Sequence, residues 1–495
     1  MNEKTLIFPV LFPALAALLI HVLKFKSRGV RNIFIELCVI FNSFLLGLLI
    51  YNPPLNTLII FRISEGAAFA FKIDGLGMVF SGLIALLWPL TGLYAFEYMK
   101  HESEKHNLDD NAFFSWFVLT FGVVAGIALS ANLLTLYLFY EIMTLTTLPL
   151  VMYAMDGRAR YAGRKYLIYS VGGAALGFIA LAFALYQGGG GNFVLGGTLG
   201  VWPQEPSNML LSAYLLGFIG FGVKAAVFPF HGWLPSASVA PTPVTALLHA
   251  VAVVKAGIFS IIRLTWYVFE PEALMGTWAH TAAFLITCAT IIYGSSMALA
   301  TQHFKRRFAY STISQLSYIL MGALLLTPEG LTGALMHMGA HAVMKINLFF
   351  CAGAVLCQTE REYLFDMRGI GLGMPKTFIA LLISGLALCG LPPTAGFVGK
   401  WQLGIAAAAS NTLGHVGLAA LAISSVLTVL YIFSIFSIAI MPGKNFDFKT
   451  ANKGVRDPGL DMLLPMGILA LGAVIYGLYA EDLLKFFSMI AVGEL

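Results

Sequence analysis

The sequence contains few charged residues. Of its 495 residues, 11% are Asp, Glu, Lys or Arg, whereas 59% are apolar. Soluble domains carry about 25% charged residues, so this composition excludes an ordinary soluble protein and predicts an integral membrane protein embedded in a lipid bilayer. The formal net charge of +5 does not indicate a nucleic-acid partner, because the basic residues lie in short segments between apolar runs.

The sequence is also poor in cysteine, and no two cysteines form a CxxC pair of the kind that binds metal. We expect the thiols to be small buried hydrophobic groups. The segments between the apolar runs are too short for a soluble domain, so no nucleotide, flavin or other cofactor and no metal is predicted. A cleavable signal peptide is not expected, since KFKSRGVR follows the first apolar run. The five cysteines are Cys38, Cys288, Cys351, Cys357 and Cys389.

The apolar residues are grouped into runs long enough to cross a bilayer. A transmembrane helix needs about 20 predominantly apolar residues, and fourteen segments meet this requirement. We therefore predict an all-α polytopic membrane protein with a single membrane domain, 1–495. The predicted spans are centred on 5–23, 33–51, 74–96, 112–130, 133–155, 165–187, 209–240, 243–269, 278–300, 308–326, 330–357, 376–408, 412–441 and 461–487.

Lysine and arginine are unequally distributed between the two sides of these spans. One set of alternate loops holds most of the 29 basic residues, whereas the other holds only Lys4, Arg62 and Lys72. Because cytoplasmic loops are enriched in these residues, both termini are predicted on the non-cytoplasmic side of a prokaryotic inner membrane. The basic loops contain Lys24, Lys26, Arg28, Arg31, Lys100, Lys105, Arg158, Arg160, Arg164, Lys165, Lys305, Arg306, Arg307, Arg361, Arg368, Lys376, Lys444, Lys449, Lys453 and Arg456.

Two of the predicted spans are interrupted by proline. The seventh contains Pro229 and Pro235, and the twelfth contains Pro392 and Pro393. A membrane tolerates such breaks only where protein or water satisfies the freed backbone groups. The two broken spans run in opposite directions, which favours a transporter fold of two inverted repeats. The expected divisions are 1–111 for helices 1–3, 112–269 for the first repeat (helices 4–8), 278–441 for the second (helices 9–13) and 461–487 for helix 14.

One acidic and one basic residue lie deep in the first half of the predicted bundle. Glu141 falls within the fifth span and Lys224 within the seventh. An isolated charge in hydrocarbon costs about 2.5–3.5 kcal/mol on insertion scales, so we expect the two side chains to pair. One interpretation is a static ion pair that fixes the helices. The other is a pair whose opening and closing changes the proton affinity of the lysine.

Histidine and lysine recur together in the eighth and eleventh spans. His249 and Lys255 would point about 120° apart and differ by about 9 Å in height on one helix, so we predict successive stations along a hydrated path. His337, His341 and Lys345 are spaced every four residues and form one polar stripe. Histidine titrates near neutrality, so this stripe suits proton relay. Haem or metal ligation by the two histidines is the rival interpretation.

Three further basic residues lie within the predicted spans. Lys400 follows the proline break of the twelfth span and is predicted to be the last residue of the line, with a stabilising contact to a backbone carbonyl as the alternative. Arg263 and Lys485 lie near the ends of their spans. We interpret both as side chains that reach out to the membrane surface.

Four stretches of the sequence resemble a known family. The most specific are VKAAVFPFHGWLPSASVAPTPVTALLHA and FKRRFAYSTISQLSY, and HMGAHAVMKINLFFCAG and LPPTAGFVGKW support them. From the fourth span to the thirteenth, the chain is similar to the antiporter-like subunits shared by respiratory complex I, Mrp-type sodium/proton antiporters (the D-type subunit) and membrane-bound hydrogenases.

The resemblance implies a role for each buried charged residue. Glu141 matches the fifth-helix glutamate of the family, and Lys224 matches the seventh-helix lysine that pairs with it. One complex I member has glutamate at the position of Lys400, so the lysine argues against that member. The short segment after the fourteenth span argues against the largest complex I subunit, which carries a long lateral helix. The relay and terminal positions of the eighth, eleventh and twelfth helices are matched by His249, Lys255, His337, His341, Lys345 and Lys400.

These features together predict a subunit that carries protons, with exchange for sodium left open, among sister subunits of a larger membrane complex. Nothing in the chain supplies electrons, so redox energy would come from partner subunits of an oxidoreductase, and the chain is not predicted to be an enzyme alone. Two alternatives remain. A stand-alone solute transporter would need a midplane pocket with varied polar groups, and a haem-binding redox subunit would be coloured.

Overall fold

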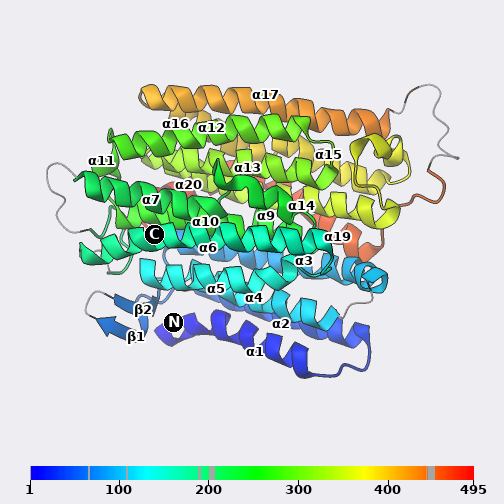
Figure 1. Cartoon of the computed structure of the whole chain (residues 1–495), viewed down its shortest axis with the longest axis horizontal. Coiled ribbons are helices and arrows are strands. Elements are labelled where there is room, and N and C mark those ends of the chain that lie inside the picture. Colours follow the sequence, from blue (N-terminus) through cyan, green and yellow to red (C-terminus); the bar gives the residue numbers. More distant parts are fainter. Residues whose placement is uncertain are drawn as a thin grey trace.

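The apolar runs form long helices that lie side by side and extend from one end of the molecule to the other (Figure 1). Eleven helical segments of the described chain are long and apolar enough to cross a membrane. The prediction of an all-α integral membrane protein is thereby confirmed, whereas the number of fourteen spans stays a prediction. The computed structural model describes residues 2–64, 67–106, 110–187, 191–199, 207–441, 443 and 452–495.

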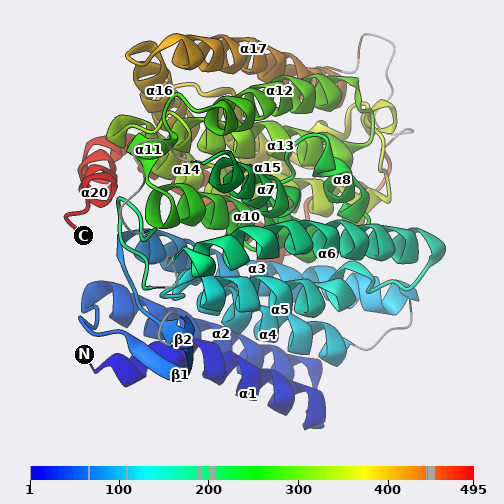
Figure 2. The same ribbon diagram turned by 60° about the vertical axis from the view of Figure 1, so that its left-hand side comes forward.

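The first half of the chain begins at one side of the bundle, where helices α1 to α5 lie in both views (Figures 1 and 2). Its seventh and eighth predicted spans are each divided into short helical pieces. The elements are η1 (Glu3–Ile7), α1 (Phe8–Val22), α2 (Arg28–Tyr51), α3 (Gly75–His106), α4 (Asp110–Ala128), α5 (Leu133–Val151), α6 (Gly157–Tyr186), α7 (Asn208–Lys224), η2 (Phe230–Gly232), α8 (Trp233–Ala237), α9 (Thr242–Ala250), α10 (Val253–Ile262) and the π-helix η3 (Arg263–Val268).

The second half contains a long, deeply buried helix and the helix on the opposite side of the bundle. Every residue of α14 from Gly330 to Val355 is buried, whereas α17 lies at the far edge in both views (Figures 1 and 2). The elements are α11 (Pro271–Leu274), α12 (Trp278–Ala300), α13 (Phe304–Ala323), α14 (Pro328–Thr359), η4 (Leu364–Met367), η5 (Ile370–Leu372), α15 (Pro375–Cys389), α16 (Ala395–Ala408), α17 (Thr412–Ile440), α19 (Leu460–Leu478) and α20 (Ala480–Val492).

Many of the long helices begin at a polar side chain that accepts a hydrogen bond from a backbone N–H of the first turn. Such caps satisfy donors that have no partner inside the helix. They also explain why the helices begin close to the predicted boundaries of the apolar runs. The capping residues include Ser27, Asn132, Asp156, Ser207, Thr277, Thr327 and Asn411.

A short β-hairpin lies between the second and third spans and was not predicted. Strand β1 (Leu58–Ser64) pairs antiparallel with β2 (Ala67–Phe71). The strands contain several isoleucine and phenylalanine residues, which favour extended backbone. The hairpin and both chain termini lie at the same end of the bundle (Figures 1 and 2).

Among the residues that the structure describes, the eighth span is interrupted as well as the two spans for which the sequence predicted a break. The predicted breaks follow Lys224 in the seventh span and Cys389 in the twelfth. The third lies at Val251 and Ala252, between α9 and α10. The eighth span therefore is not one continuous helix, and the angular offset expected for its histidine and lysine does not apply.

The last predicted span, 461–487, also differs from the structure. The helix α19 ends at Leu478, and a separate helix, α20, begins at Ala480. The α20 helix buries Phe487, Ile490 and Ala491 against the rest of the bundle. Its Lys485 is exposed and pairs with Glu481 one turn earlier, with Nζ and Oε1 2.9 Å apart.

Ion pairs hold several of the basic loops together at the end of the bundle opposite the hairpin. They join α2 to α3 and α4, α3 to the C-terminal end of α14, and the start of α6 to the segment after α14. Lys305 and Arg307 are buried in the first turn of α13. They are therefore not loop residues, although the count of basic residues in the loops included them. The pairs are Arg28–Glu104, Arg31–Asp110, Lys105–Glu360 and Arg158–Glu362.

Arg263 is buried and does not reach the surface, so its interpretation as a surface-seeking side chain is wrong. Its guanidinium nitrogens contact both carboxylate oxygens of Asp74 at 2.5 and 2.6 Å, and the rings of Phe193, Phe259 and Tyr267 surround it. Burial alone would raise the pKa of Asp74, but the Arg263 charge and the hydrogen bonds to the carboxylate outweigh burial and lower it. The pair ties the start of α3 to η3.

We predict that replacing Arg263 by Met destabilises the protein more than replacing both Arg263 by Met and Asp74 by Asn. Removing one partner of a buried pair costs about 3–5 kcal/mol, because the other charge is left unpaired. The unfolding midpoint of the purified protein in mild detergent measures this difference. Since the folded-state pKa of Asp74 is lowered, the stabilisation is present above about pH 4 and is lost as the pH falls through the lowered pKa. Equal losses in the single and double variants would contradict the prediction.

Candidate functional site

The predicted pair of Glu141 and Lys224 is present in the structure. The Lys224 Nζ lies 3.7 Å from Glu141 Oε1, donates a hydrogen bond to the Tyr140 backbone carbonyl and lies 3.3 Å from the centre of the Tyr140 ring. The lysine side chain is 0% exposed and that of the glutamate is 30% exposed. The pair therefore joins the buried end of α7 to a carboxylate at the lateral surface of this chain.

The end of α7 at Lys224 is enclosed by groups that satisfy its backbone. The Trp233 indole N–H donates to the Val223 carbonyl at 2.7 Å, which also accepts from the Ala226 backbone N–H at 3.1 Å in the turn that ends the helix. Gly257 of α10 packs directly on this turn, because a Cβ atom at that position would overlap the Ala225 amide nitrogen and lie 2.9 Å from the Lys224 carbonyl carbon. A glycine at position 257 is thus required for α10 to approach the break.

His249 and Lys255 lie on either side of the break in the eighth span. Both side chains are 0% exposed. The two His249 ring nitrogens and the Lys255 Nζ have no hydrogen-bond partner among the described residues. The His249 ring packs against Phe349 of α14, with ring centres 4.7 Å apart. Buried polar groups of this kind normally bind ordered water, so both residues suit a hydrated path.

The polar stripe of α14 is fully buried, as its spacing predicted. The rings of His337 and His341 are 6.5 Å apart. The Lys345 Nζ donates to the Phe308 carbonyl of α13 at 3.1 Å and to the Ser311 hydroxyl. His341 has no hydrogen-bond partner for either ring nitrogen within the described chain.

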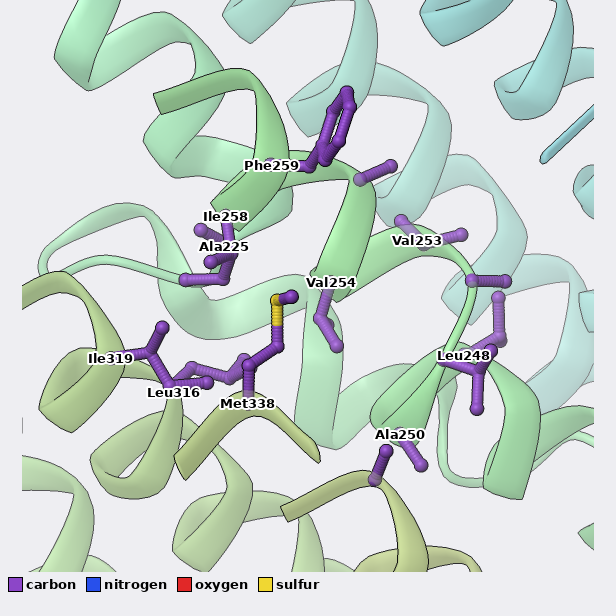
Figure 3. Close-up of a cluster of buried hydrophobic side chains, with 14 of the residues drawn as sticks. Ala225, Leu248, Ala250, Val253, Val254, Ile258, Phe259, Leu316, Ile319 and Met338 are labelled. Carbon is purple, nitrogen blue, oxygen red and sulfur yellow. The ribbon is translucent and has the colours of Figure 1, made fainter. Parts of the chain in front are cut away.

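Electrostatic interactions join the stations of two helices around His341. This histidine interacts with Lys255 and His249 of the eighth span and with Lys345 and His337 of its own helix. Apolar side chains fill the space around them. Figure 3 shows such a cluster, with Val253 and Val254 of α10, Leu316 and Ile319 of α13 and Met338 of α14. The structure therefore brings five of the predicted residues together. The side chain of Lys224 is not in this group, because its described contacts are with residues of α5.

Lys400 lies in the second turn of α16 and reaches back to the preceding helix. Its Nζ donates to the carbonyls of Leu388 and Cys389 at 2.9 and 3.1 Å, and it lies 3.5 Å from the Ser425 hydroxyl. Carbonyls at a helix C-terminus form its negative pole and stabilise a cation. The contact to backbone carbonyls that the sequence offered as the alternative role is therefore present, together with a hydroxyl that can exchange protons.

A cavity of about 190 Å³ lies at the basic end of the bundle, next to the residues that directly precede α9. The Lys305 Nζ forms part of its lining and donates to the Ala240 carbonyl at 2.8 Å. Lys305 also interacts electrostatically with His249. Burial and the neighbouring Arg306 lower the pKa of His303 to about 4, so its ring is neutral at pH 7. The lining includes Tyr98, His101, Glu102, Asp156, Arg158, His303, Lys305, Arg306 and Glu362.

Sequence reasoning missed several buried polar residues, on α2 and on α13. Glu36 of α2 has two buried carboxylate oxygens without a hydrogen-bond partner in the described chain, so Glu141 is not alone as a carboxylate in the first half. Gln315 of α13 contacts His337 directly, and Lys305 of the same helix binds the Ala240 carbonyl ahead of α9. The polar residues of FKRRFAYSTISQLSY could have been found by their spacing along one helix. Within the described part of the chain, no group of three or more His, Cys, Asp and Glu residues is arranged to hold a metal ion.

A comparison with protein families gives a match over the residues that carry this site. The family model described as "NADH:quinone oxidoreductase/Mrp antiporter, TM" matches residues 130–430. The NADH-quinone oxidoreductase subunit N of Desulforudis audaxviator is 30% identical over 418 residues, which are 82% of this chain and 80% of that protein. A Na⁺/H⁺ antiporter subunit of Alkalihalophilus pseudofirmus is 33% identical over 355 residues, which are 68% of this chain and 42% of that protein.

Solved structures share the fold over almost the whole chain. A chain of the archaeal membrane-bound sulfane sulfur reductase matches with a TM-score of 0.83 and 22% identity, and covers 99% of this chain and 97% of that chain. The Mrp complex of a Dietzia species gives 0.83, 21% identity and the same coverage. Respiratory complex I of Thermus thermophilus gives 0.80 and 23% identity over 98% of this chain and 99% of that chain.

We predict that Gly257→Ala destabilises the protein, because the added methyl group would overlap backbone at the end of α7. Adding a methyl group to such a close contact costs about 1–3 kcal/mol, measured as a lower unfolding midpoint in mild detergent. Gly172→Ala in α6 is the matched control, since a Cβ there meets nothing within 4 Å. It should leave the midpoint unchanged or raise it, since alanine favours a helix over glycine by about 1 kcal/mol. An unchanged midpoint for Gly257→Ala would show that α10 can move away without cost.

Proposed function

Because this chain belongs to the family of transmembrane subunits of NADH:quinone oxidoreductases and Mrp antiporters, we propose that it translocates protons as one subunit of a multisubunit membrane complex. The observation that supports this proposal is the line of buried lysine and histidine side chains, several of which lack a hydrogen-bond partner within the described chain. Nitrogen bases of this kind take up and release protons. Sodium, in contrast, is coordinated by oxygen atoms in transporters, so we propose protons as the ion.

The proposed mechanism begins at the Glu141–Lys224 pair. When the pair is closed, the carboxylate stabilises the charged form of the lysine. When the pair opens, Lys224 remains in apolar surroundings, where the neutral form is favoured and the proton is released. The change in the charge of Lys224 then changes the proton affinity of the next titratable residue along the line, because a nearby charge favours or disfavours the charged form of its neighbour.

The proposed path runs through both halves of the chain, each of which contains an interrupted span. From Lys224 the effect passes to Lys255 and His249 on either side of the break in the eighth span. It continues along the α14 stripe to Lys400. We propose that the cavity next to the start of α9 connects this line with the aqueous phase at the basic end, through Lys305. The inverted repeats, with 112–269 as the first and 278–441 as the second, are part of the same proposal.

The relatives also suggest the setting of the subunit. The archaeal reductase, the Mrp complex and complex I are multisubunit membrane assemblies, and we propose sister membrane subunits as the partners of this chain. The partial exposure of Glu141 supports contact with such a neighbour, because a carboxylate facing lipid would be costly. We further propose a prokaryotic inner membrane, with the basic end in the cytoplasm and both termini on the other side.

We predict that Lys224→Ala and Glu141→Ala each reduce proton transport in the reconstituted parent complex at least about tenfold, because each removes a group that changes protonation in the cycle. A pH-sensitive dye trapped inside the liposomes measures the rate. Lys485→Ala is the matched control, since this lysine is exposed on α20 and should not affect the rate. Wild-type rates in both variants would exclude the ion-pair mechanism.

The parent complex is to be identified by gentle extraction from the native membrane and mass spectrometry of the copurifying chains. Hydrogenase or quinone-reductase subunits would make this chain the proton-carrying part of a redox complex. Small hydrophobic antiporter subunits, without a cofactor protein, would make it part of an Mrp-type exchanger. A protein that purifies alone and transports protons in liposomes would contradict the multisubunit proposal.

A further inference from the structure

The polar groups between His337 and Lys400 come from a third helix. These two residues lie on α14 and α16, and α13 packs against both helices. The α13 helix carries buried polar side chains along its length, among them Ser311, Gln315 and Tyr318, each 0% exposed. None of these is a residue of the proposed line. Their contacts nevertheless connect its last two members.

Gln315 contacts His337 directly. Its Oε1 lies 3.0 Å from the His337 Nε2, a distance at which a protonated Nε2 donates a hydrogen bond to the amide oxygen. The Gln315 Nε2 has no partner within the described chain. The amide oxygen therefore holds the proton on the His337 Nε2. The other ring nitrogen, Nδ1, has no hydrogen-bond partner within the described chain and is free to accept a proton.

Tyr318 lies one turn further along α13, between the histidine and the lysine. Its ring centre is 5.5 Å from that of His337 and 5.5 Å from the Lys400 Nζ. Its hydroxyl donates to the Ser424 Oγ at 2.5 Å and interacts with Gln315 and Ser425. Ser425 is the hydroxyl that lies 3.5 Å from the Lys400 Nζ. A chain of hydrogen-bonding groups thus extends from the lysine to the histidine.

We propose that Tyr318 and Ser425 relay protons between Lys400 and His337, and that Gln315 is the positioning residue for the histidine. The inference rests on the proposed function. A proton leaves the Lys400 ammonium for the Ser425 oxygen while the serine proton passes to the Tyr318 oxygen, and the phenol proton passes to the His337 Nδ1, the ring nitrogen without a partner within the described chain. The ammonium loses one proton, the imidazole gains one, and both hydroxyl groups are neutral before and after. The reverse transfer follows the same atoms.

Transport by the reconstituted complex tests this relay. Tyr318→Phe keeps the ring and removes only the hydroxyl, and should slow proton transport at least about tenfold, because a positioned proton-transfer group is lost. Ser425→Ala should slow transport, and Ser425→Thr, which retains a hydroxyl, should restore it. Tyr214→Phe is the matched control, because it removes a buried hydroxyl that contacts Thr265 at 3.2 Å, away from the line. It should transport at the wild-type rate.

Two further measurements separate a relay from a structural role. Gln315→Met should change the pH dependence of transport, because no amide oxygen then holds the proton on the His337 Nε2. Tyr318→Phe combined with Lys400→Ala should be no slower than Lys400→Ala alone, since both act on one path. Wild-type rates and pH profiles in Tyr318→Phe and Ser425→Ala, with slow transport in Lys400→Ala, would overturn the relay and leave the proposed function intact. A wild-type complex that moves no protons would overturn both.

Discussion

A lysine ammonium inside a membrane bundle is stabilised by nearby oxygen atoms, and the arrangement around three of the buried lysines depends on that interaction. Lys255, whose Nζ has no hydrogen-bond partner within the described chain, differs from them. Lys224, Lys345 and Lys400 each donate to at least one backbone carbonyl. A continuous helix offers few free carbonyls, because each is already bonded to an N–H one turn later. The ends of interrupted helices supply the additional acceptors. This explains why the best-held lysine, Lys400, lies beside a break.

Interrupted helices are stable here only because other groups cover them closely. The break after Lys224 is closed by the Trp233 indole and by the backbone of α10 at Gly257. The break in the twelfth span is covered in a similar way, since a Cβ atom at Gly399 would lie 2.8 Å from the His337 ring. The same glycine therefore brings the α14 stripe next to the terminal lysine. The close approach of the α16 backbone to α14 is thus also what places the titratable side chains of the two helices near each other.

Some of this arrangement could be predicted because its cause is local in the sequence. The cost of an isolated charge predicted the pairing of Glu141 with Lys224, and the four-residue spacing predicted the buried stripe of α14. The break at Val251 and Ala252 could not be predicted, because neither residue is proline or glycine. The buried pair of Arg263 could not be predicted either, since its partner Asp74 lies 189 residues away in the chain.

The helix α13 shows why apolar composition alone does not reveal which helix connects the titratable residues. Its polar residues reduce its apolar character, so it is not among the eleven helical segments that qualify as membrane spans by composition, although it is almost completely buried. Those polar groups are shielded from lipid by the helices around them and contact Lys345, His337 and the side chains near Lys400. A helix can remain polar in a membrane if its partners provide the hydrogen bonds. The polarity of α13 is therefore accounted for by the residues that it joins.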